Sequence, residues 1–410
     1  MTPACQSLAT AFAPSRTAGL EKLAQFLPRA GADYAKLRNY DYGAGRHHNV
    51  SGLSPYLRHR LICEDEVLAA VLGRHSLQAA DKFVAEVFWR TYWKGWFELR
   101  PSVWTNYQGA LAQAKHDVMS QGGLRQQWEA ACYGTTGIDC FDHWAKELVE
   151  TGYLHNHARM WFASIWVHTL ELPWELGADF FMRHLLDGDP ASNTLSWRWV
   201  CGMHTAGKTY LARADNIAKF TEGRFRPTGL ASYARPLGHP DHPKPMPLSI
   251  PSVIESSKRT GFLLHDDDFD LTHLLAAAPK NIYAAAYIPS LTGVSPWHVS
   301  DTVQSFVDGL RNECMIRYAD RLPNITDTTT VDDVIAWAKN ADLEQIVVPT
   351  PTIGPMRTTL DKIRAQLSAT GIQTCEIRAP YDTLCWPKAT HGFFRFKENI
   401  PKFIETLRLK

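Results

Sequence analysis

The spacing of hydrophobic residues divides the chain into two parts with different periods. In the first part, apolar residues recur every three or four positions, as Phe83, Val87, Trp93 and Trp96 do within SLQAADKFVAEVFWRTYWKGWFEL. This spacing is typical of one face of an amphipathic helix. Runs of β-branched residues stay scarce in this part, so the pattern predicts an all-α domain over residues 1–225.

A further helix is predicted over SPYLRHRLICEDEVLAAVLG. Serine is a favoured N-cap residue, and proline is favoured in the first turn of a helix. Ser54 and Pro55 occupy these two positions at the start of the segment. We therefore expect one continuous helix that is capped by Ser54.

Prolines interrupt the helical pattern over residues 226–256. They stand at positions 227, 236, 240, 243, 245, 247 and 251. Because proline fixes φ and lacks an N–H group, it is excluded from helix interiors and central strands. The segment is therefore predicted to be an extended linker that follows the protein surface.

After the linker, short apolar runs alternate with amphipathic segments. The candidate strands are TGFLLH, NIYAAAYIP, NITDTT, QIVVPTPT and IQTCEIRA, with a candidate helix between each strand and the next. This alternation predicts a parallel sheet with right-handed crossovers. The expected fold class is α + α/β with two domains, in which a Rossmann-like parallel α/β domain over residues 257–410 follows the all-α domain. No G-x-G-x-x-G follows the first strand, which disfavours a standard dinucleotide site there.

Composition narrows the class of protein. The chain has 410 residues, of which 45% are hydrophobic, enough for two or three domains with substantial cores. A formal net charge of +1 gives no overall basic signal for nucleic acid. Eight scattered cysteines without a C-x-x-C pair, and a beginning without a secretory pattern, predict free thiols in the cytoplasm. We expect a monomer with no metal site and no membrane-spanning helix.

A charged turn among many aromatic residues distinguishes residues 153–199. The region reads YLHNHARMWFAS, then PWELGADFFMRHLLDGDPASN, then LSWRWV. In this order, the three blocks resemble the flavin-binding region of the photolyase and cryptochrome superfamily, whose pattern is TGxxHNRxRM, then FMxxLxDGDxAxN, then WQW. The end of the chain, DTLCWPKATHGFFRFKENIPKFI, resembles the end of that family's α/β antenna domain, which normally comes first. The resemblance implies a circularly permuted, photolyase-like chain.

The resemblance implies FAD as the cofactor, and it leaves the identity of a second, antenna chromophore open. Arg159 is expected to pair with Asp187 beside the isoalloxazine, the Asn193 amide to face flavin N5, and Asp189 to bind ribityl or ribose hydroxyls. Exposed N–H groups and hydroxyls at a helix start would bind the pyrophosphate. Val50 stands where the family usually has threonine. The expected cofactor-binding residues are Tyr34, Val50, Ser51, Leu53, Ser54, Phe83, Arg90, Arg159, Asp187, Gly188, Asp189 and Asn193.

The same resemblance implies a pocket for damaged DNA. Trp89 and Trp199 would stack on a pyrimidine pair that is turned out of the duplex. Asn156 stands where enzymes of the cyclobutane-dimer type have asparagine and enzymes of the (6-4) type have histidine. The expected substrate-binding residues are Arg38, Glu86, Trp89, Asn156, Met160 and Trp199.

Electron supply is the third function that the resemblance assigns. Trp197 and Trp174 match the first two members of the family's tryptophan relay, whereas the third position falls in HDVMSQ, without a tryptophan. Trp104, Trp161 and Trp166 are the alternatives for the relay's exit. The expected catalytic residues are Glu86, Asn156, Arg159, Asp187, Asn193, Trp174 and Trp197.

Two functions share such a flavin site. The first is a deoxyribodipyrimidine photolyase, a carbon–carbon lyase that uses light to repair cyclobutane pyrimidine dimers in UV-damaged DNA, either single- or double-stranded. The alternative is a cryptochrome-like blue-light photoreceptor without repair activity. Glu86, Trp89, Asn156 and Trp199 together favour repair, because a receptor has no need of a lesion pocket. A flavin protein without photochemistry and a helical DNA-binding module are weaker alternatives.

Overall fold

The computed structural model describes residues 12–205, 208–234, 236–238, 241–279, 282–291 and 293–409. The prediction of a helical domain from residue 1 is therefore untested over residues 1–11. Cys5, Pro240 of the predicted linker and Asn281 of a predicted strand also lie outside the described residues.

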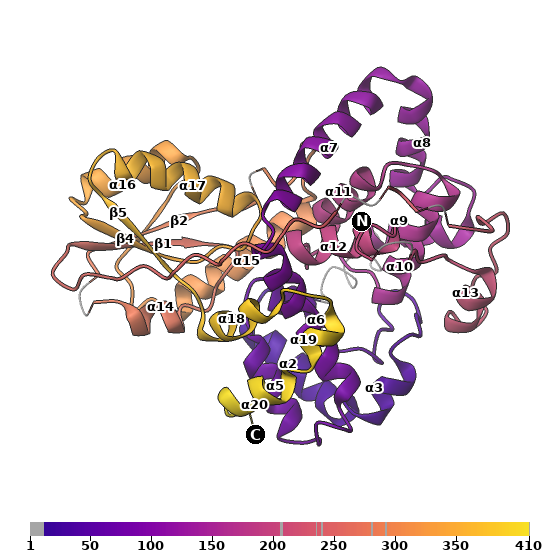
Figure 1. The fold of residues 1–410 in the computed structure, drawn as a ribbon, viewed down its shortest axis with the longest axis horizontal. Helices are drawn as coiled ribbons and strands as arrows, with labels where there is room; N and C mark the ends of the chain where they lie inside the picture. Colours follow the sequence, from indigo (N-terminus) through magenta and orange to yellow (C-terminus); the bar gives the residue numbers. More distant parts are fainter. Residues whose placement is uncertain are drawn as a thin grey trace.

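Helices make up the first part of the chain, and no strand occurs among the described residues between 12 and 225 (Figure 1). Two short turns of other helix types, η1 (Leu27–Arg29) and the π-helical η2 (Ile165–Thr169), accompany the α-helices. The α-helices are α2 (Arg16–Phe26), α3 (Ala32–Leu37), α4 (Ser54–Arg58), α5 (Glu64–Leu72), α6 (Asp81–Glu98), α7 (Ser102–Ser120), α8 (Gly122–Tyr133), α9 (Asp139–Thr151), α10 (Asn156–Ser164), α11 (Trp174–His184), α12 (Pro190–Val200) and α13 (Ala214–Phe220).

The prediction of one continuous helix after Ser54 is wrong. Helix α4 ends at Arg58, and α5 begins at Glu64 after a turn in which Arg60 has a φ of 52°. Ser54 is the first helical residue of α4, and its side chain makes no capping hydrogen bond. The second helix has its own start, because the Glu66 side chain accepts a hydrogen bond from the Cys63 backbone N–H at 2.8 Å.

The predicted parallel sheet is present in the second part. Its five strands lie in the order β3-β2-β1-β4-β5, and all four neighbouring pairs are parallel. In Figure 1, α16 and α17 cover one face of the sheet, and α14 and α15 cover the other. The elements are β1 (Thr260–His265), α14 (Thr272–Ala277), β2 (Ala284–Ile288), α15 (Asp301–Arg317), β3 (Ile325–Asp327), α16 (Val331–Asn340), β4 (Gln345–Pro349), α17 (Pro355–Ser368) and β5 (Gln373–Ile377).

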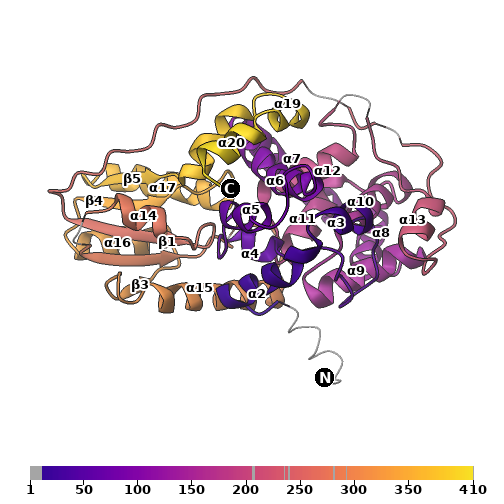
Figure 2. The same cartoon turned by 90° about the horizontal axis from the view of Figure 1, so that it is seen from below.

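The chain ends on the helical part rather than on the sheet. Helices α18 (Pro380–Cys385), η3 (Trp386–Lys388), α19 (Phe393–Lys397) and α20 (Ile400–Thr406) return from β5 to the side of α6 (Figures 1 and 2). The approach is close, because a Cβ atom on Gly95 of α6 would lie 2.9 Å from the Cα atom of Trp386. The Tyr92 hydroxyl also donates a hydrogen bond to the His391 carbonyl at 2.9 Å.

The proline-rich linker is extended and follows the surface, as its composition predicts. Figure 2 shows it running along one side of the molecule from α13 to the sheet. Backbone contacts hold it in place: the N–H of Met246 donates to the carbonyl of Leu99 at 2.8 Å, and the N–H of Ser252 donates to the carbonyl of Glu376 at 3.3 Å. Across the described ranges, no helix combines the length and apolar character that a membrane span requires.

Candidate functional site

A turn rich in aspartate joins helices α11 and α12. We call Asp187, Gly188 and Asp189 the aspartate turn. Asp189 caps α12, because its Oδ1 atom accepts a hydrogen bond from the Ser192 N–H at 2.8 Å, and Pro190 follows as the first helical residue. A Cβ atom on Gly188 would lie 3.2 Å from the carbonyl oxygens of both Leu185 and Met182, so a side chain has little room there.

An arginine from α10 holds the first carboxylate of the turn. Arg159 donates from Nη1 and Nη2 to the two oxygens of Asp187 at 3.0 and 2.9 Å. The Arg159 Nε–H donates to the Leu154 carbonyl at 2.8 Å, which fixes the guanidinium plane. The Asp187 side chain is 5% exposed and that of Arg159 is 22% exposed, so the pair is accessible mainly from the arginine side. The structure thus brings together the two residues that the sequence pattern pairs.

Three cations surround the second carboxylate of the turn. The Oδ2 atom of Asp189 lies 3.6 Å from Arg90 Nη1, 3.8 Å from Lys94 Nζ and 4.0 Å from Arg58 Nε. Burial alone would raise the pKa of the Asp189 carboxyl, but Arg90, Lys94 and Arg58 outweigh it and hold this pKa below its usual range. Burial lowers the pKa of the Lys94 ammonium to about 8, with Arg90 adding repulsion and Asp189 opposing both. Asp189 is therefore a carboxylate at neutral pH.

Asn193 lies one turn into α12, and its side chain is buried. Its Nδ2 atom donates to the Ala178 carbonyl of α11 at 2.8 Å. One N–H of the amide is used in this contact, which leaves the second N–H as a donor and the amide oxygen as an acceptor for a ligand.

An aromatic residue, Phe12, lies between the loop before α4 and Arg159. The sequence patterns did not single it out. Gly52 has a φ of 61°, and a Cβ atom there would meet only the Phe12 ring, at 3.8 Å. The Phe12 ring lies 5.2 Å from the Tyr153 ring, and the Arg159 guanidinium lies 5.5 Å from the same tyrosine. Phe12 therefore connects the expected pyrophosphate loop to the Arg159–Asp187 pair. It stands in an Ala- and Ser-rich segment without periodicity, so no local signal marks it.

Several polar atoms around the aspartate turn are buried without a hydrogen-bond partner among the described residues. They include Asp189 Oδ2, Ser192 Oγ and Arg58 Nη1. A buried polar group without a partner costs about 1–3 kcal/mol, so such groups in a native protein call for an explanation. A ligand rich in hydroxyl and phosphate groups would supply donors and acceptors for these atoms. The residues present therefore fit a cofactor such as FAD.

Comparison with known proteins agrees with this chemistry. A family described as the FAD binding domain of DNA photolyase matches residues 83–229, which include most of α6 and the aspartate turn. The deoxyribodipyrimidine photo-lyase of a Synechococcus species is 32% identical over 193 residues, which cover 45% of this chain and 38% of that protein. The enzyme of the same name from Thermus thermophilus is 33% identical over 201 residues, covering 48% of this chain and 45% of that protein.

Three solved structures overlap with about half of this chain. A class III photolyase from Agrobacterium tumefaciens is 24% identical, with a TM-score of 0.43 and coverage of 54% of this chain and 46% of that chain. A cryptochrome from a Synechocystis species is 22% identical, with a TM-score of 0.44 and coverage of 52% and 44%. An archaeal photolyase from Sulfolobus tokodaii, described with two FAD molecules, is 26% identical, with a TM-score of 0.40 and coverage of 52% and 45%.

Residues 83–229 thus resemble the FAD binding domain of DNA photolyase, and FAD is the cofactor of the domain that they match. The chain spans less than half the length of the curated relatives described above.

The residues expected at the DNA pocket contact different partners within the chain. Arg38 forms an ion pair with Glu86 of α6, and its guanidinium lies 6.0 Å from the Tyr34 ring. The Tyr34 ring lies 5.3 Å from that of Phe83 in a buried aromatic cluster. Glu86 and Arg38 thus each have an intramolecular partner.

Trp89 has an aromatic partner from the far end of the chain. The Phe393 ring of α19 stacks on it, with ring centroids 3.7 Å apart and an interplanar angle of 12°. Phe393 thus covers one face of the Trp89 ring and leaves the opposite face outside this stack. Trp199 stacks on Tyr210 at 5.8 Å, while Asn156 is exposed at the first position of α10 and Met160 is half-buried on the same helix. Phe393 is separated from Trp89 by about three hundred positions, so hydrophobic spacing could not reveal the stack.

Aromatic residues near the expected relay form two groups. Trp197 packs against Phe181 and Trp166, with ring centroids 5.2 and 6.2 Å away. Trp174 contacts Tyr107 at 5.5 Å, and Tyr107 contacts Trp104 at 5.3 Å, both on α7. Among the three alternatives for the exit, Trp104 is the one that a ring contact connects to Trp174, through Tyr107.

Gly177 controls the position of Trp197, and replacing it with alanine tests that packing. The added Cβ atom would lie 2.3 Å from Cη2 and 2.6 Å from Cζ3 of Trp197, so the indole must move. We expect Gly177→Ala to lower the free energy of unfolding by about 1–3 kcal/mol, as overpacking of a core does. Urea unfolding followed by tryptophan fluorescence measures the change. Gly109→Ala on α7 is the matched control, because nothing lies within 4 Å of its Cβ position and alanine favours helix there. Equal stability of the Gly177→Ala variant and the wild type would contradict the packing described above.

Proposed function

We propose that this chain is a light-driven DNA repair enzyme, a deoxyribodipyrimidine photolyase that acts on cyclobutane pyrimidine dimers. The observation that carries the proposal is the aspartate turn, with Asp187 clamped by Arg159 and Asp189 surrounded by three cations, inside the FAD-binding region. When bound, FAD would supply the light-driven electron chemistry of the repair, and Arg159, Asp187 and Asp189 would hold it. The protein residues hold the cofactor and the damaged bases and exclude water.

The residues proposed to contact the dimer are those that the sequence pattern assigns. Trp89 and Trp199 would each offer one ring face for stacking, which contributes about 1–3 kcal/mol per base. Glu86, Asn156 and Met160 would contact the base edges, and asparagine at position 156 favours the cyclobutane type of dimer over the (6-4) type. Turning such a dimer out of the duplex is inexpensive, because damage has already weakened its pairing.

The end of the chain supports binding to DNA. Although the whole chain has a net charge of only +1, basic residues are concentrated after Trp386. This segment has two acidic residues, Glu398 and Glu405, and six basic ones: Lys388, Arg395, Lys397, Lys402, Arg408 and Lys410. Lys388, Arg395, Lys402 and Arg408 are exposed. Lysine and arginine side chains of this kind neutralise phosphates. Phe393 of this segment stacks on Trp89, one of the residues proposed to contact the dimer, which supports a role of the segment in DNA binding.

A cryptochrome-like photoreceptor without repair is the second candidate, and one specific observation favours it. Trp89, Glu86 and Arg38 all have partners within the chain, namely Phe393 for the tryptophan and each other for the ion pair. A repair enzyme must keep such groups available for DNA, whereas a receptor need not.

We also propose the domain organisation that the sequence suggests: a helical FAD domain over residues 1–225, a linker over residues 226–256 and an antenna-like α/β domain over residues 257–410. The order of the elements supports a circular permutation of the family's usual arrangement, because the described helices up to α13 precede all five strands. The return of α18–α20 to α6 supports it as well. We propose a cytoplasmic monomer that acts on UV-damaged DNA.

Illumination of the reduced protein with dimer-containing oligonucleotides tests the proposal. We expect loss of the dimer, measured by chromatography of the digested DNA, in blue or near-UV light and not in the dark, with single and double strands tested in parallel. Trp199→Ala is expected to reduce this repair strongly, and Tyr133→Ala, which removes an aromatic residue that is 72% exposed, is the control. Photoreduction of bound flavin without repair of either substrate would favour the photoreceptor. A purified chain without flavin would refute both functions.

A further inference from the structure

The carboxyl edge of the sheet contacts the turn between α4 and α5. The strand order reverses between β1 and β4, and open α/β sheets bind ligands outside the carboxyl ends of their strands at such a point. Here the turn between α4 and α5 contacts the loop after β1, residues 266–270. His59 Nδ1–H donates to the Asp266 carbonyl at 2.6 Å, and the Phe269 N–H donates to the His59 carbonyl at 2.9 Å. Burial lowers the pKa of His59 to about 3, so this imidazole is neutral at physiological pH.

Arg58 connects this loop to the aspartate turn. Its Nε–H donates to the Gly188 carbonyl at 2.7 Å, and its Nη2 group donates to Asp267 Oδ1 at 2.9 Å. The side chains of Arg58 and Asp267 are 7% and 6% exposed. Burial alone would raise the pKa of Asp267, but Arg58 outweighs it and holds this pKa below its usual range. One guanidinium thus bridges a loop of the sheet and the turn that carries Asp187 and Asp189.

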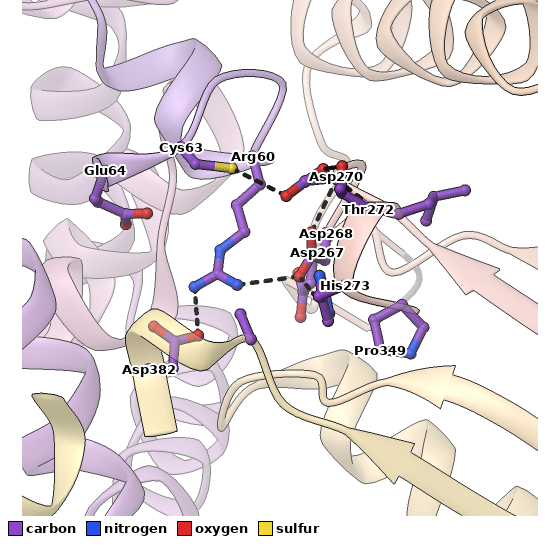
Figure 3. A network of polar contacts seen from close by, with 12 residues as sticks. Arg60, Cys63, Glu64, Asp267, Asp268, Asp270, Thr272, His273, Pro349 and Asp382 are labelled. Atoms are coloured by element: carbon purple, nitrogen blue, oxygen red, sulfur yellow. Dashed lines mark hydrogen bonds and ion pairs between the residues drawn. The ribbon is translucent and has the colours of Figure 1, made fainter. Parts of the chain in front are cut away.

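Arg60 makes similar contacts but does not reach the aspartate turn. Figure 3 shows its guanidinium between Asp268 and Asp382, with a distance of 3.1 Å to Asp268 Oδ2. The Arg60 and Asp268 side chains are each 6% exposed, like those of the Arg58 pair. The two arginines therefore stabilise the contact between the same segments in a similar way, but only Arg58 contacts Gly188.

We propose that Asp267 is a positioning residue for the flavin site, which acts through Arg58. A free arginine side chain has many rotamers, and fixing them costs up to about 2 kcal/mol. The Asp267 carboxylate fixes one rotamer, and in it the Arg58 Nε–H holds the carbonyl of Gly188. Asp187 and Asp189 flank that carbonyl, so their directions depend on it. The α/β part of the chain would thereby preorganise the cofactor site of the helical part. This inference rests on the proposed FAD site at the aspartate turn.

The test compares two neighbouring aspartates that are equally buried. FAD affinity is measured by fluorescence titration, the environment of the bound flavin by visible circular dichroism, and stability by urea unfolding, all on the full chain. We expect Asp267→Asn to weaken FAD binding about tenfold, which corresponds to the loss of one charged hydrogen bond, and to change the flavin spectrum. Asp268→Asn is expected to lower the unfolding midpoint to a similar extent but to change FAD affinity less than about threefold. Asp320→Asn, at an exposed position, should change neither property.

A second variant covers the case in which Asp267→Asn does not fold. Arg58→Lys keeps the positive charge near Asp267, but a single ammonium lacks the planar fork that serves two acceptors at once. We expect this variant to fold and still to lose FAD affinity. The inference would be overturned, without affecting the proposed function, if Asp267→Asn or Arg58→Lys bound FAD as tightly as the wild type does. It would also be overturned if Asp268→Asn lost as much FAD affinity as Asp267→Asn. Absence of FAD binding in the wild type would overturn the proposed function together with it.

Discussion

Replacing Asp189 with asparagine is expected to lower the free energy of unfolding by about 3–5 kcal/mol, the cost of leaving a buried charge without its partner. Asparagine is as good a helix N-cap as aspartate, so the substitution removes the charge and retains the hydrogen bond to the Ser192 N–H. Arg58 and Arg90 keep other carboxylates, Asp267 at 2.9 Å and Glu64 at 3.1 Å. Lys94 is 2% exposed and pairs only with Asp189 among the described residues, so it bears most of the loss.

The pH dependence of this loss identifies Lys94 as its cause. The pKa of Lys94 is already lowered by burial to about 8, and removal of the Asp189 charge lowers it further. Over the pH range between the folded pKa and the ordinary value of 10.5, the unfolded chain binds one proton more than the folded one, so stability rises with pH. In Asp189→Asn this rise begins at lower pH than in the wild type. The difference between the two proteins should therefore be larger at pH 6 than at pH 9.

Urea unfolding at these two pH values, followed by tryptophan fluorescence, measures the effect. Lys94→Met in the Asp189→Asn background should recover much of the stability at pH 6, because it removes the unpaired cation and retains an apolar stem of similar length. A loss that is independent of pH, or one that Lys94→Met does not reduce, would show that the charges around Asp189 are not balanced in the way described here.

Local sequence patterns predicted the elements of this fold well, because hydrophobic periodicity depends on neighbours along the chain. The runs TGFLLH and QIVVPTPT became β1 and β4, and the prolines between residues 226 and 256 produced an extended linker. The pairing of Arg159 with Asp187 followed from a motif and not from periodicity. Each of these features is encoded within a short window or within a recognisable family block.

Contacts between distant segments could not be predicted in this way. The break between α4 and α5 leaves no trace in the spacing of apolar residues, because aspartates more than two hundred positions away hold the turn at Arg58 and Arg60. Asp267 and Asp268, in the loop after β1, likewise have their partners in the helical part. Phe12 and Phe393 likewise reach the site from the two ends of the described chain. These contacts arise from tertiary packing, which the local spacing of apolar residues does not reveal.

Loss of the arginine beside Asp187 is expected to have the largest effect on the cofactor. Arg159→Leu leaves a carboxylate that is 5% exposed without a cation, so the free energy of unfolding should fall by about 3 kcal/mol. If the pair lies beside the flavin, as proposed, FAD affinity should fall at least about tenfold, since a charge-assisted contact of this type contributes more than 1.4 kcal/mol. Arg159→Lys should be intermediate, because lysine keeps the charge but cannot make the two parallel hydrogen bonds to Asp187. Fluorescence titration with FAD and urea unfolding measure the two effects.

Arg213→Leu is the matched control for this substitution. Arg213 also makes two hydrogen bonds to one carboxylate, that of Asp215, but the two side chains are 67% and 66% exposed. An exposed ion pair contributes about 0–1 kcal/mol, so this variant should retain its stability and its flavin. Because the two pairs share their chemistry and differ in burial and position, a difference in FAD affinity between the variants assigns the cofactor to the Arg159 side of the molecule. Equal affinities would place the flavin elsewhere and would remove the main support for a light-driven function.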